Sequence, residues 1–135
     1  MDCIFCKIVA KEIQGKVIFE NDAAIGILDV HPIAPGHTLV ISKIHAPSIL
    51  DLEDDQIESV FMGVKRVVEL LSETLKVDGF TYGINQGEVS GQTIPHFHVH
   101  VVPRWRGDGG MTFHGIVNNP PKETLDSIYK KIKNK

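Results

Sequence analysis

Histidines alternate with apolar residues in the stretch His96-Phe97-His98-Val99-His100-Val101-Val102-Pro103, which holds three of the seven histidines of the chain. Successive side chains of a β-strand point to opposite faces of a sheet. A strand here would therefore carry three imidazoles on one face and an apolar row on the other. The apolar row predicts a core-facing surface. The imidazole row predicts a working site, because imidazole transfers protons, attacks electrophiles and binds metals near neutral pH. The alternative is a surface strand that happens to be rich in histidine.

The segments outside this stretch predict an antiparallel sheet and one long helix. Between Glu53 and Lys76, apolar residues recur with helical spacing, and acidic residues begin the segment, as suits the positive end of a helix dipole. A short helix is expected near the C-terminus, after Pro120-Pro121. Turn residues bound short apolar segments, which we expect to be strands at 16–20, 23–29, 37–42 and 79–85. Because no βαβ alternation occurs, the predicted class is α+β, a five-stranded antiparallel sheet with the long helix on one face.

Composition and charge limit the classes of function. The 135 residues are expected to form one domain, and a content of 42% hydrophobic and 23% charged residues is typical of a globular chain. The net charge of −3 gives no general attraction to nucleic acids or anionic membranes. The sequence contains neither a signal-peptide pattern nor a segment of membrane-spanning length. We therefore expect a cytoplasmic protein, with reduced thiols and without nucleic-acid or membrane partners.

The chain has two cysteines, Cys3 and Cys6, which form a Cys-x-x-Cys pair. Such a pair can be a redox dithiol, half of a metal site, or two idle thiols. The redox interpretation needs a thioredoxin-like βαβ context, which this sequence does not predict. A tetrahedral zinc ion would need two more ligands, and histidines can supply them. Outside the alternating stretch the candidates, among which the pattern does not select, are His31, His37, His45 and His114.

Several segments together resemble the histidine triad (HIT) family. The run Asn85–Arg104, which contains the alternating histidines, looks like the family signature. The segments 3–8, 28–41 and 43–45 also match bacterial members in order and spacing. The resemblance covers residues 3–104 and leaves 105–135 as a C-terminal tail. It implies a HIT-type fold for one domain of residues 1–135, paired into a homodimer.

The resemblance implies a nucleotide hydrolase or transferase. The middle histidine, His98, would attack the α-phosphorus of a purine nucleotide, such as an AMP derivative, and form a nucleotidyl-histidine that water then hydrolyses. Neutral imidazole is a competent nucleophile for such a two-step displacement. A backbone carbonyl would hold the other ring N–H of His98, so that the correct nitrogen is presented.

Other positions match family residues that contact the substrate. His100 and His37 would stabilise charge on phosphate oxygens, and Thr93 would contact the leaving group. Asp29 would accept from the ribose hydroxyls, although an aspartate before a proline-rich loop also fits a turn-capping role. The catalytic residues implied are thus His98, His100, His37 and Thr93. The nucleotide-binding residues implied are Asp29, Asn85, Gly91, Thr93, His98 and His100.

The resemblance also implies a structural zinc ion, as in some bacterial members and in the related galactose-phosphate uridylyltransferases. The ligands that map onto this chain are Cys3, Cys6, His45 and His96. Such an ion would fix the strand that bears His98 to the N-terminal segment, and catalysis itself would need no cofactor. A rival hypothesis makes the alternating histidines themselves a catalytic metal site, since alternate histidines of a strand can share one ion.

The expected reaction is cleavage of nucleoside phosphoramidates or adenylates. Two alternatives stay open: a hydrolase of dinucleoside polyphosphates of the diadenosine tetraphosphate type, and a nucleotide-binding regulatory module with incidental turnover. A zinc-dependent interaction protein is a third possibility. The tail after Arg104 differs from that of eukaryotic phosphoramidases, so the sequence does not specify the leaving group.

Overall fold

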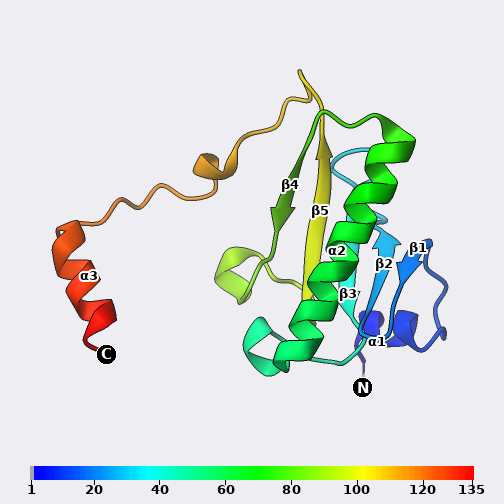
Figure 1. The fold of residues 1–135 in the computed structure, drawn as a ribbon, viewed down its shortest axis with the longest axis horizontal. Helices are drawn as coiled ribbons and strands as arrows, with labels where there is room; N and C mark the ends of the chain where they lie inside the picture. Colours follow the sequence, from blue (N-terminus) through cyan, green and yellow to red (C-terminus); the bar gives the residue numbers. More distant parts are fainter. Residues whose placement is uncertain (1) are drawn as a thin grey trace.

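The fold is built on an antiparallel sheet, and the computed structural model describes residues 2–135 (Figure 1). The strands are β1 (Val17–Glu20), β2 (Ala24–Leu28), β3 (Thr38–Ser42), β4 (Gly79–Gly83) and β5 (His98–Arg104). They lie in the order β1-β2-β3-β5-β4 across the sheet. The α-helices of the described residues are α1 (Ile4–Val9), α2 (Asp54–Leu75) and α3 (Leu125–Lys133). The predicted α+β class, with its five-stranded antiparallel sheet, long helix and short C-terminal helix, is confirmed.

Helix α2 covers one face of the sheet and forms the main core with it (Figure 1). The helix begins where the acidic segment predicts, and Gln56 Oε1 accepts from Glu53 N at 2.9 Å. Fully burying one aliphatic side chain stabilises a fold by about 1.5–3 kcal/mol, so the buried apolar residues of β5 help to hold this strand against α2. The core combines α2, β3 and the apolar row beside the histidines, with Val40, Val60, Val64, Val67, Leu71, Phe97, Val99 and Val101 among its buried members.

The opposite face of the sheet carries α1 and the histidines of β5. Across the ladder, Ile41 of β3 pairs with His98, and Leu39 pairs with His100. Both aliphatic residues pack with Phe5 of α1 in a second buried cluster. His98 and His100 therefore share the α1 face, as the alternation predicts.

His96 departs from the predicted strand. Strand β5 begins at His98. His96 N donates to Ile94 O at 2.8 Å, and Phe97 N donates to Ala46 O at 2.7 Å, so these amides bond to loop residues rather than to a neighbouring strand. The prediction of a continuous strand through all three histidines is therefore wrong at His96.

The other elements lie close to their predicted bounds, with one addition. Strand β4 ends at Gly83 rather than Asn85, and the predicted bounds of the other strands and of the long helix differ from the observed bounds by one or two residues. Helix α1 was not predicted. It has six residues, which is too short for a helical pattern to stand out in the sequence.

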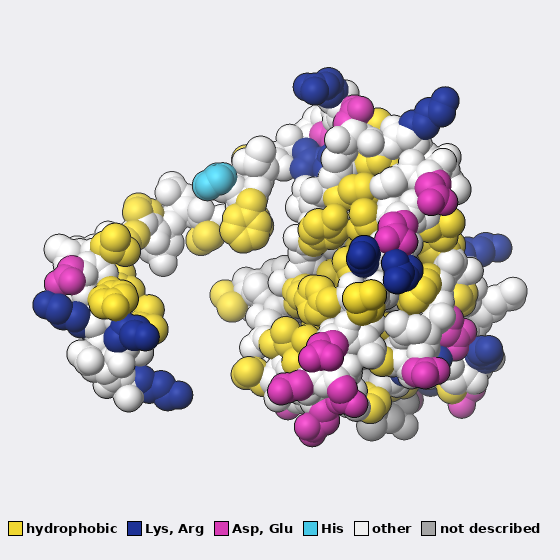
Figure 2. All heavy atoms as spheres, in the orientation of Figure 1, with side chains coloured by type: hydrophobic (Ala, Val, Ile, Leu, Met, Phe, Trp, Pro, Cys, Tyr) yellow, Lys and Arg dark blue, Asp and Glu magenta, His cyan; other side chains and the backbone are white. Residues whose placement is uncertain are grey.

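Residues 105–135 form an arm that leaves the end of β5 and carries α3 away from the sheet (Figure 1). Hydrophobic side chains lie along this C-terminal arm and over the face of the body that carries α2 (Figure 2). In α3, Leu125, Tyr129 and Ile132 recur at helical spacing and are 85%, 58% and 69% exposed. Among the described residues, none of the helices combines the length and the apolar character needed to span a membrane.

Candidate functional site

His98 is held in one tautomer by the backbone. Its Nδ1 lies 2.6 Å from the carbonyl oxygen of His96. A carbonyl oxygen only accepts, so Nδ1 carries the proton and Nε2 keeps its lone pair. The ring centroid lies 5.0 Å from that of Phe5, and the two planes are nearly perpendicular at 75°. Nε2 is therefore the nitrogen left to act as a nucleophile.

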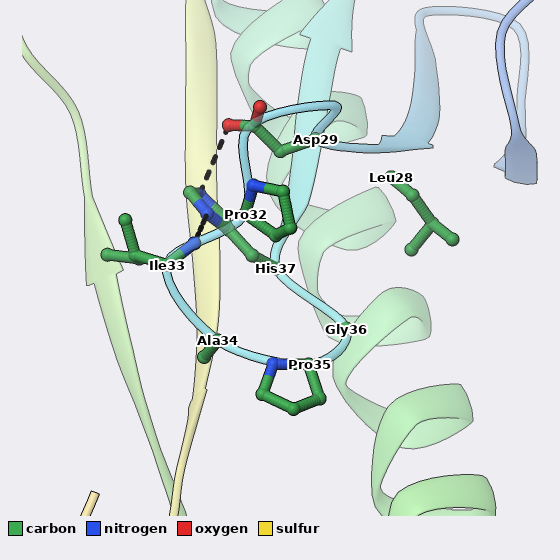
Figure 3. A pocket seen from close by; sticks show the side chains of 8 residues that line it. All are labelled: Leu28, Asp29, Pro32, Ile33, Ala34, Pro35, Gly36 and His37. Carbon is green, nitrogen blue, oxygen red and sulfur yellow. Dashed lines mark hydrogen bonds and ion pairs between the residues drawn. The ribbon is translucent and has the colours of Figure 1, made fainter.

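A hydrogen bond from His37 determines which ring nitrogen of His100 carries the proton. The Nε2 atom of His37 lies 2.9 Å from Nδ1 of His100. The other nitrogen of His37, Nδ1, accepts from Ile33 N at 3.3 Å (Figure 3). Since a backbone N–H only donates, the ring proton of His37 is on Nε2 and is donated to His100. Neutral His100 then has its own proton on Nε2, where it can be donated to a bound anion.

Asp29 lies between β2 and β3, and its side chain contacts two residues of the following loop. Its Oδ1 accepts from His31 N at 2.9 Å, which is the turn-capping contact considered from the sequence. Its Oδ2 lies 3.6 Å from His37 Nε2 (Figure 3). The loop from residue 32 to 37, together with Leu28 and Asp29, lines a surface pocket. This pocket opens beside His37.

Burial lowers the pKa of each of these imidazoles. For His98, loss of hydration lowers the pKa, and the hydrogen bond to the His96 carbonyl opposes part of this effect. Burial also lowers the pKa of His37, with opposition from the charge of Asp29. The pKa of His100 falls to about 4, first through burial and then through the neighbouring His98 and His37. All three imidazoles are thus neutral at pH 7, the state in which imidazole is nucleophilic.

A second cluster, on the N-terminal side of His98, consists of Cys3, Cys6, His45 and His96. The potential ligand atoms of these residues all lie within 4.8 Å of one another. His96 Nε2 donates to Ser42 O at 2.6 Å, so Nδ1 presents its lone pair to the cluster. This nitrogen lies 3.3 Å from Cys3 Sγ and 3.5 Å from Cys6 Sγ. The fold thus brings together the predicted metal ligands.

The donor set of this cluster fits a tetrahedral zinc ion. Thiolate and imidazole are the usual ligands of structural zinc, and normal Zn–S and Zn–N bonds place neighbouring donors roughly 3.3–3.8 Å apart. Here the Nδ1 atoms of His45 and His96 are 3.2 Å apart, and His45 Nδ1 lies 3.2 Å from Cys6 Sγ. Burial raises the pKa of the Cys6 thiol, so a metal ion would have to displace a proton on binding.

Neither rival metal site has suitable donors. His96 directs Nδ1 to the cysteines, whereas His98 uses Nδ1 to donate to a carbonyl, so the alternating histidines do not converge on one ion. Asp29, His37 and His100 also lie close together. However, His37 keeps the proton on Nε2 and therefore has no lone pair there for a metal.

Asn85 and Gly91, both predicted to contact phosphate, lie side by side. A methyl group added at Gly91 would stand 3.6 Å from Asn85 Nδ2. Gly91 has φ +101°, which favours glycine. Because Gly83 pairs with His100, Asn85 follows β4 toward the level of His98.

Thr93 lies outside the hydrogen bonds that hold His98 and join His37 to His100. Its side chain is exposed and lines a depression with Cys3, His45 and Pro95. Within residues 2–135, the hydrogen bonds do not connect Thr93 with the histidines of β5. The structure thus brings together His37, His98 and His100 but places Thr93 beside the second cluster.

Two residues that contact the histidines were missed from the sequence. Phe5 packs against the rings of both His96 and His98. Its place between the two cysteines of the Cys-x-x-Cys pair could have indicated that Phe5 lies near the histidines. Ile33 acts through its backbone N–H, which any residue but proline provides, so its side chain gave no signal.

Comparison with known proteins agrees with this geometry. The family model described as HIT domain matches residues 10–107. An uncharacterised HIT-like protein of Methanocaldococcus jannaschii is 40% identical over 131 residues, which cover 97% of this chain and 98% of that protein. An adenosine 5'-monophosphoramidase of Saccharomyces cerevisiae is 31% identical over 134 residues, covering 96% and 80% of the two chains. A zinc-bound histidine triad family protein from Mycobacterium smegmatis has a similar structure, with a TM-score of 0.77, 37% identity and coverage of 84% and 81%.

Proposed function

This chain belongs to the HIT family, and on that premise we propose that it cleaves nucleoside phosphoramidates or adenylates at the α-phosphorus through a nucleotidyl-His98 intermediate. The observation that carries the proposal is the hydrogen bond from His98 Nδ1 to His96 O, which leaves Nε2 unprotonated. The monophosphoramidase among its relatives favours an adenosine nucleotide, and a purine nucleotide is accordingly the proposed substrate.

The reaction divides into two displacements at phosphorus. In the first, His98 Nε2 bonds to the α-phosphorus while the bond to the leaving group breaks; an amine leaves with a proton taken up from solvent, and an acyl group leaves as its carboxylate. In the second, water attacks the same phosphorus, the N–P bond breaks, and the nucleoside monophosphate leaves. Splitting the displacement lowers each barrier. The depressed pKa of His98 keeps its imidazole available for the first step at neutral pH.

His100 is the proposed donor to the phosphate, and His37 supports it. With its proton on Nε2, His100 can hydrogen-bond a nonbridging oxygen as charge develops. His37 is 4% exposed and uses both ring nitrogens within the protein, so it acts on the phosphate through His100. The sequence predicts that both His37 and His100 act on the phosphate oxygens; we propose direct contact for His100 alone.

The pocket beside Asp29 is the proposed nucleoside site. Asp29 would accept from ribose hydroxyls with the lone pairs left by its contacts to His31 and His37. Asn85 would contact the phosphate, and Thr93 the leaving group. The Gly91 N–H donates to Glu88 O at 3.0 Å, so it would contact the phosphate only after this bond breaks.

We propose a structural zinc ion at Cys3, Cys6, His45 and His96. Their donor spacing supports this assignment, as does the zinc-bound relative. The ion would hold the N-terminal segment against the residue that precedes β5. The phosphate contacts proposed above involve only protein side chains and backbone.

The C-terminal arm supports a proposed homodimer. A nine-residue helix has little stability of its own in water, so α3 needs a surface to pack on. Strand β4 is an edge of the sheet, and apolar side chains near it and on α2 are exposed, including Phe61, Met62, Tyr82 and Ile84. We propose that the C-terminal arm of each chain packs on the exposed apolar residues near β4 and α2 of a second copy, in a symmetric dimer.

Turnover with a panel of substrates tests the proposed reaction. Adenosine 5'-phosphoramidate should be hydrolysed to AMP by the wild-type protein and not by the His98→Asn variant. Diadenosine polyphosphates cleaved at a higher kcat/KM than the phosphoramidate would favour the alternative hydrolase. Binding of AMP without turnover of either class would favour the regulatory module.

A further inference from the structure

Phe5 connects the cysteine-histidine cluster with His98. It is 4% exposed and belongs to α1, between Cys3 and Cys6. Its ring centroid lies 5.0 Å from that of His98, with planes at 75°, and 5.8 Å from that of His96, with planes at 87°. One aromatic side chain thus contacts a residue of the cluster and the proposed nucleophile.

The hydrogen bond to His96 does not by itself fix the ring of His98. It holds Nδ1, but the terminal torsion of histidine has a broad energy well, so the ring can tilt about this bond. Perpendicular packing against Phe5 limits the tilt on one side, and the His100 ring, 5.1 Å away, limits it on another. In-line attack on phosphorus requires the lone pair of Nε2 to point within about 10–20° of its target.

Phe5 lies on α1, a short helix that packs on the sheet through few buried side chains. Phe5 and Ile8 are the buried residues of α1, and Cys3 and Cys6 frame Phe5 in the sequence. The Sγ atoms of both cysteines lie within 3.5 Å of His96 Nδ1. The position of the Phe5 ring therefore depends on the same segment that supplies half of the cluster.

We propose that Phe5 is a positioning residue for His98, holding the imidazole plane so that Nε2 faces the α-phosphorus. The inference rests on the proposed nucleotidyl transfer through His98. It assigns to the Cys-x-x-Cys segment a task beyond metal binding, namely the orientation of the nucleophile through an aromatic contact.

The test compares Phe5→Leu with Ile8→Val in the full-length, zinc-loaded protein. Both changes remove buried carbon from α1, but Ile8 has no aromatic ring to pack against His98. Steady-state kinetics with adenosine 5'-phosphoramidate should show kcat reduced about 10- to 100-fold in Phe5→Leu, with KM within about twofold of wild type. Nitrogen-15 NMR of the imidazoles should show faster exchange of the His98 Nδ1 proton in Phe5→Leu only. If Phe5→Leu does not fold, Phe5→Met, whose unbranched side chain adapts to the space left by the ring, gives the same comparison.

The two readouts separate this inference from the proposed function. Equal losses of kcat in Phe5→Leu and Ile8→Val, or wild-type kinetics and proton exchange in Phe5→Leu, would overturn the role of Phe5. A wild-type protein without turnover would refute the proposed function, while the exchange of the His98 proton would still decide whether Phe5 holds the ring.

Discussion

Backbone hydrogen bonds decide what each histidine can do at the scale of single residues. His96 donates from Nε2 to a carbonyl and directs Nδ1 to the cysteines. His98 donates from Nδ1 to a carbonyl and leaves Nε2 free. His37 accepts an N–H on Nδ1 and so donates from Nε2. Identical side chains are thereby suited to different proposed roles: His96 to a metal ligand, His98 to a nucleophile and His37 to the support of an anion donor.

Replacing His37 tests whether its hydrogen bond to His100, called the His37–His100 relay here, supports catalysis. In His37→Ala, His100 loses the donor to its Nδ1 and can place its proton on either nitrogen. We expect kcat to fall about 10- to 100-fold, as is typical when a hydrogen-bonded supporting residue is lost. His31→Ala is the matched control, because His31 lies in the same loop with an exposed side chain and contacts Asp29 only through its backbone. A kcat within twofold of wild type in His37→Ala would contradict the relay.

The loop before β3 shows how an element positions the site. Gly36 has φ +81°, and it directly precedes His37. A methyl group at this position would lie 2.6 Å from Leu75 Cδ1 and 3.4 Å from Pro103 Cγ. The tight turn therefore needs glycine both for its backbone conformation and for its contact with α2 and β5.

Gly36→Ala should destabilise the protein. Strain from the positive φ and the clash with Leu75 together should cost about 1–3 kcal/mol in the free energy of unfolding. Gly79→Ala is the control, since a methyl group there has no neighbour within 4 Å and Gly79 has no positive φ. Urea denaturation of both variants measures the difference. Equal stability of Gly36→Ala and Gly79→Ala would refute the packing argument.

The strong periodic elements could be predicted from the sequence, whereas the short ones could not. The 22 residues of α2 and the alternation in β5 follow directly from hydrophobic spacing. Helix α1 has six residues, and its position depends on the packing of Phe5 and on the cysteine-histidine cluster, which are tertiary contacts. His96 left the strand pattern because its amide bonds locally to Ile94.

In the candidate site too, residues that belong to sequence motifs could be predicted, whereas residues that act through tertiary contacts could not. Residues with characteristic side chains in motifs, such as His98 and Cys6, were identified from the family resemblance. The amide of Ile33 and the edge of the Phe5 ring contribute through geometry, which the sequence does not reveal. The position of Thr93 beside the second cluster likewise depends on how the loop before β5 folds.

The cysteine-histidine cluster, the proposed zinc site, joins distant parts of the whole molecule. Cys3 and Cys6 lie at the N-terminus, His45 follows β3, and His96 precedes β5. An ion bound there would cross-link these segments, and its binding energy would add to the stability of the fold.

Removal of zinc should therefore lower the melting temperature. Free zinc at about 100 times its Kd contributes about 2.7 kcal/mol, which for a domain of this size corresponds to roughly 10 °C in Tm. Differential scanning calorimetry with and without a chelator measures this shift, and added zinc should reverse it. A Cys6→Ser variant should show a much smaller response to the chelator. A wild-type Tm that does not respond to chelation would contradict the metal site.

The arm should determine the assembly of the molecule. Sedimentation velocity should give wild-type protein at twice the chain mass of 15.0 kDa. Ile132→Asp places a charge on the apolar side of α3 and should shift the protein toward monomer, whereas Lys130→Gln on the same helix should not. A monomeric wild type, or an Ile132→Asp variant that stays dimeric, would contradict the proposed role of the arm.

The central claim, nucleophilic attack by His98, is tested most directly by intact-mass spectrometry. Wild type and His98→Ala would be mixed briefly with adenosine 5'-phosphoramidate and quenched without acid, because an N–P bond to histidine is acid-labile. The account predicts an added AMP mass on the wild type alone, which disappears as AMP accumulates in solution. AMP release by wild type without an adduct, or equal release by His98→Ala, would contradict it.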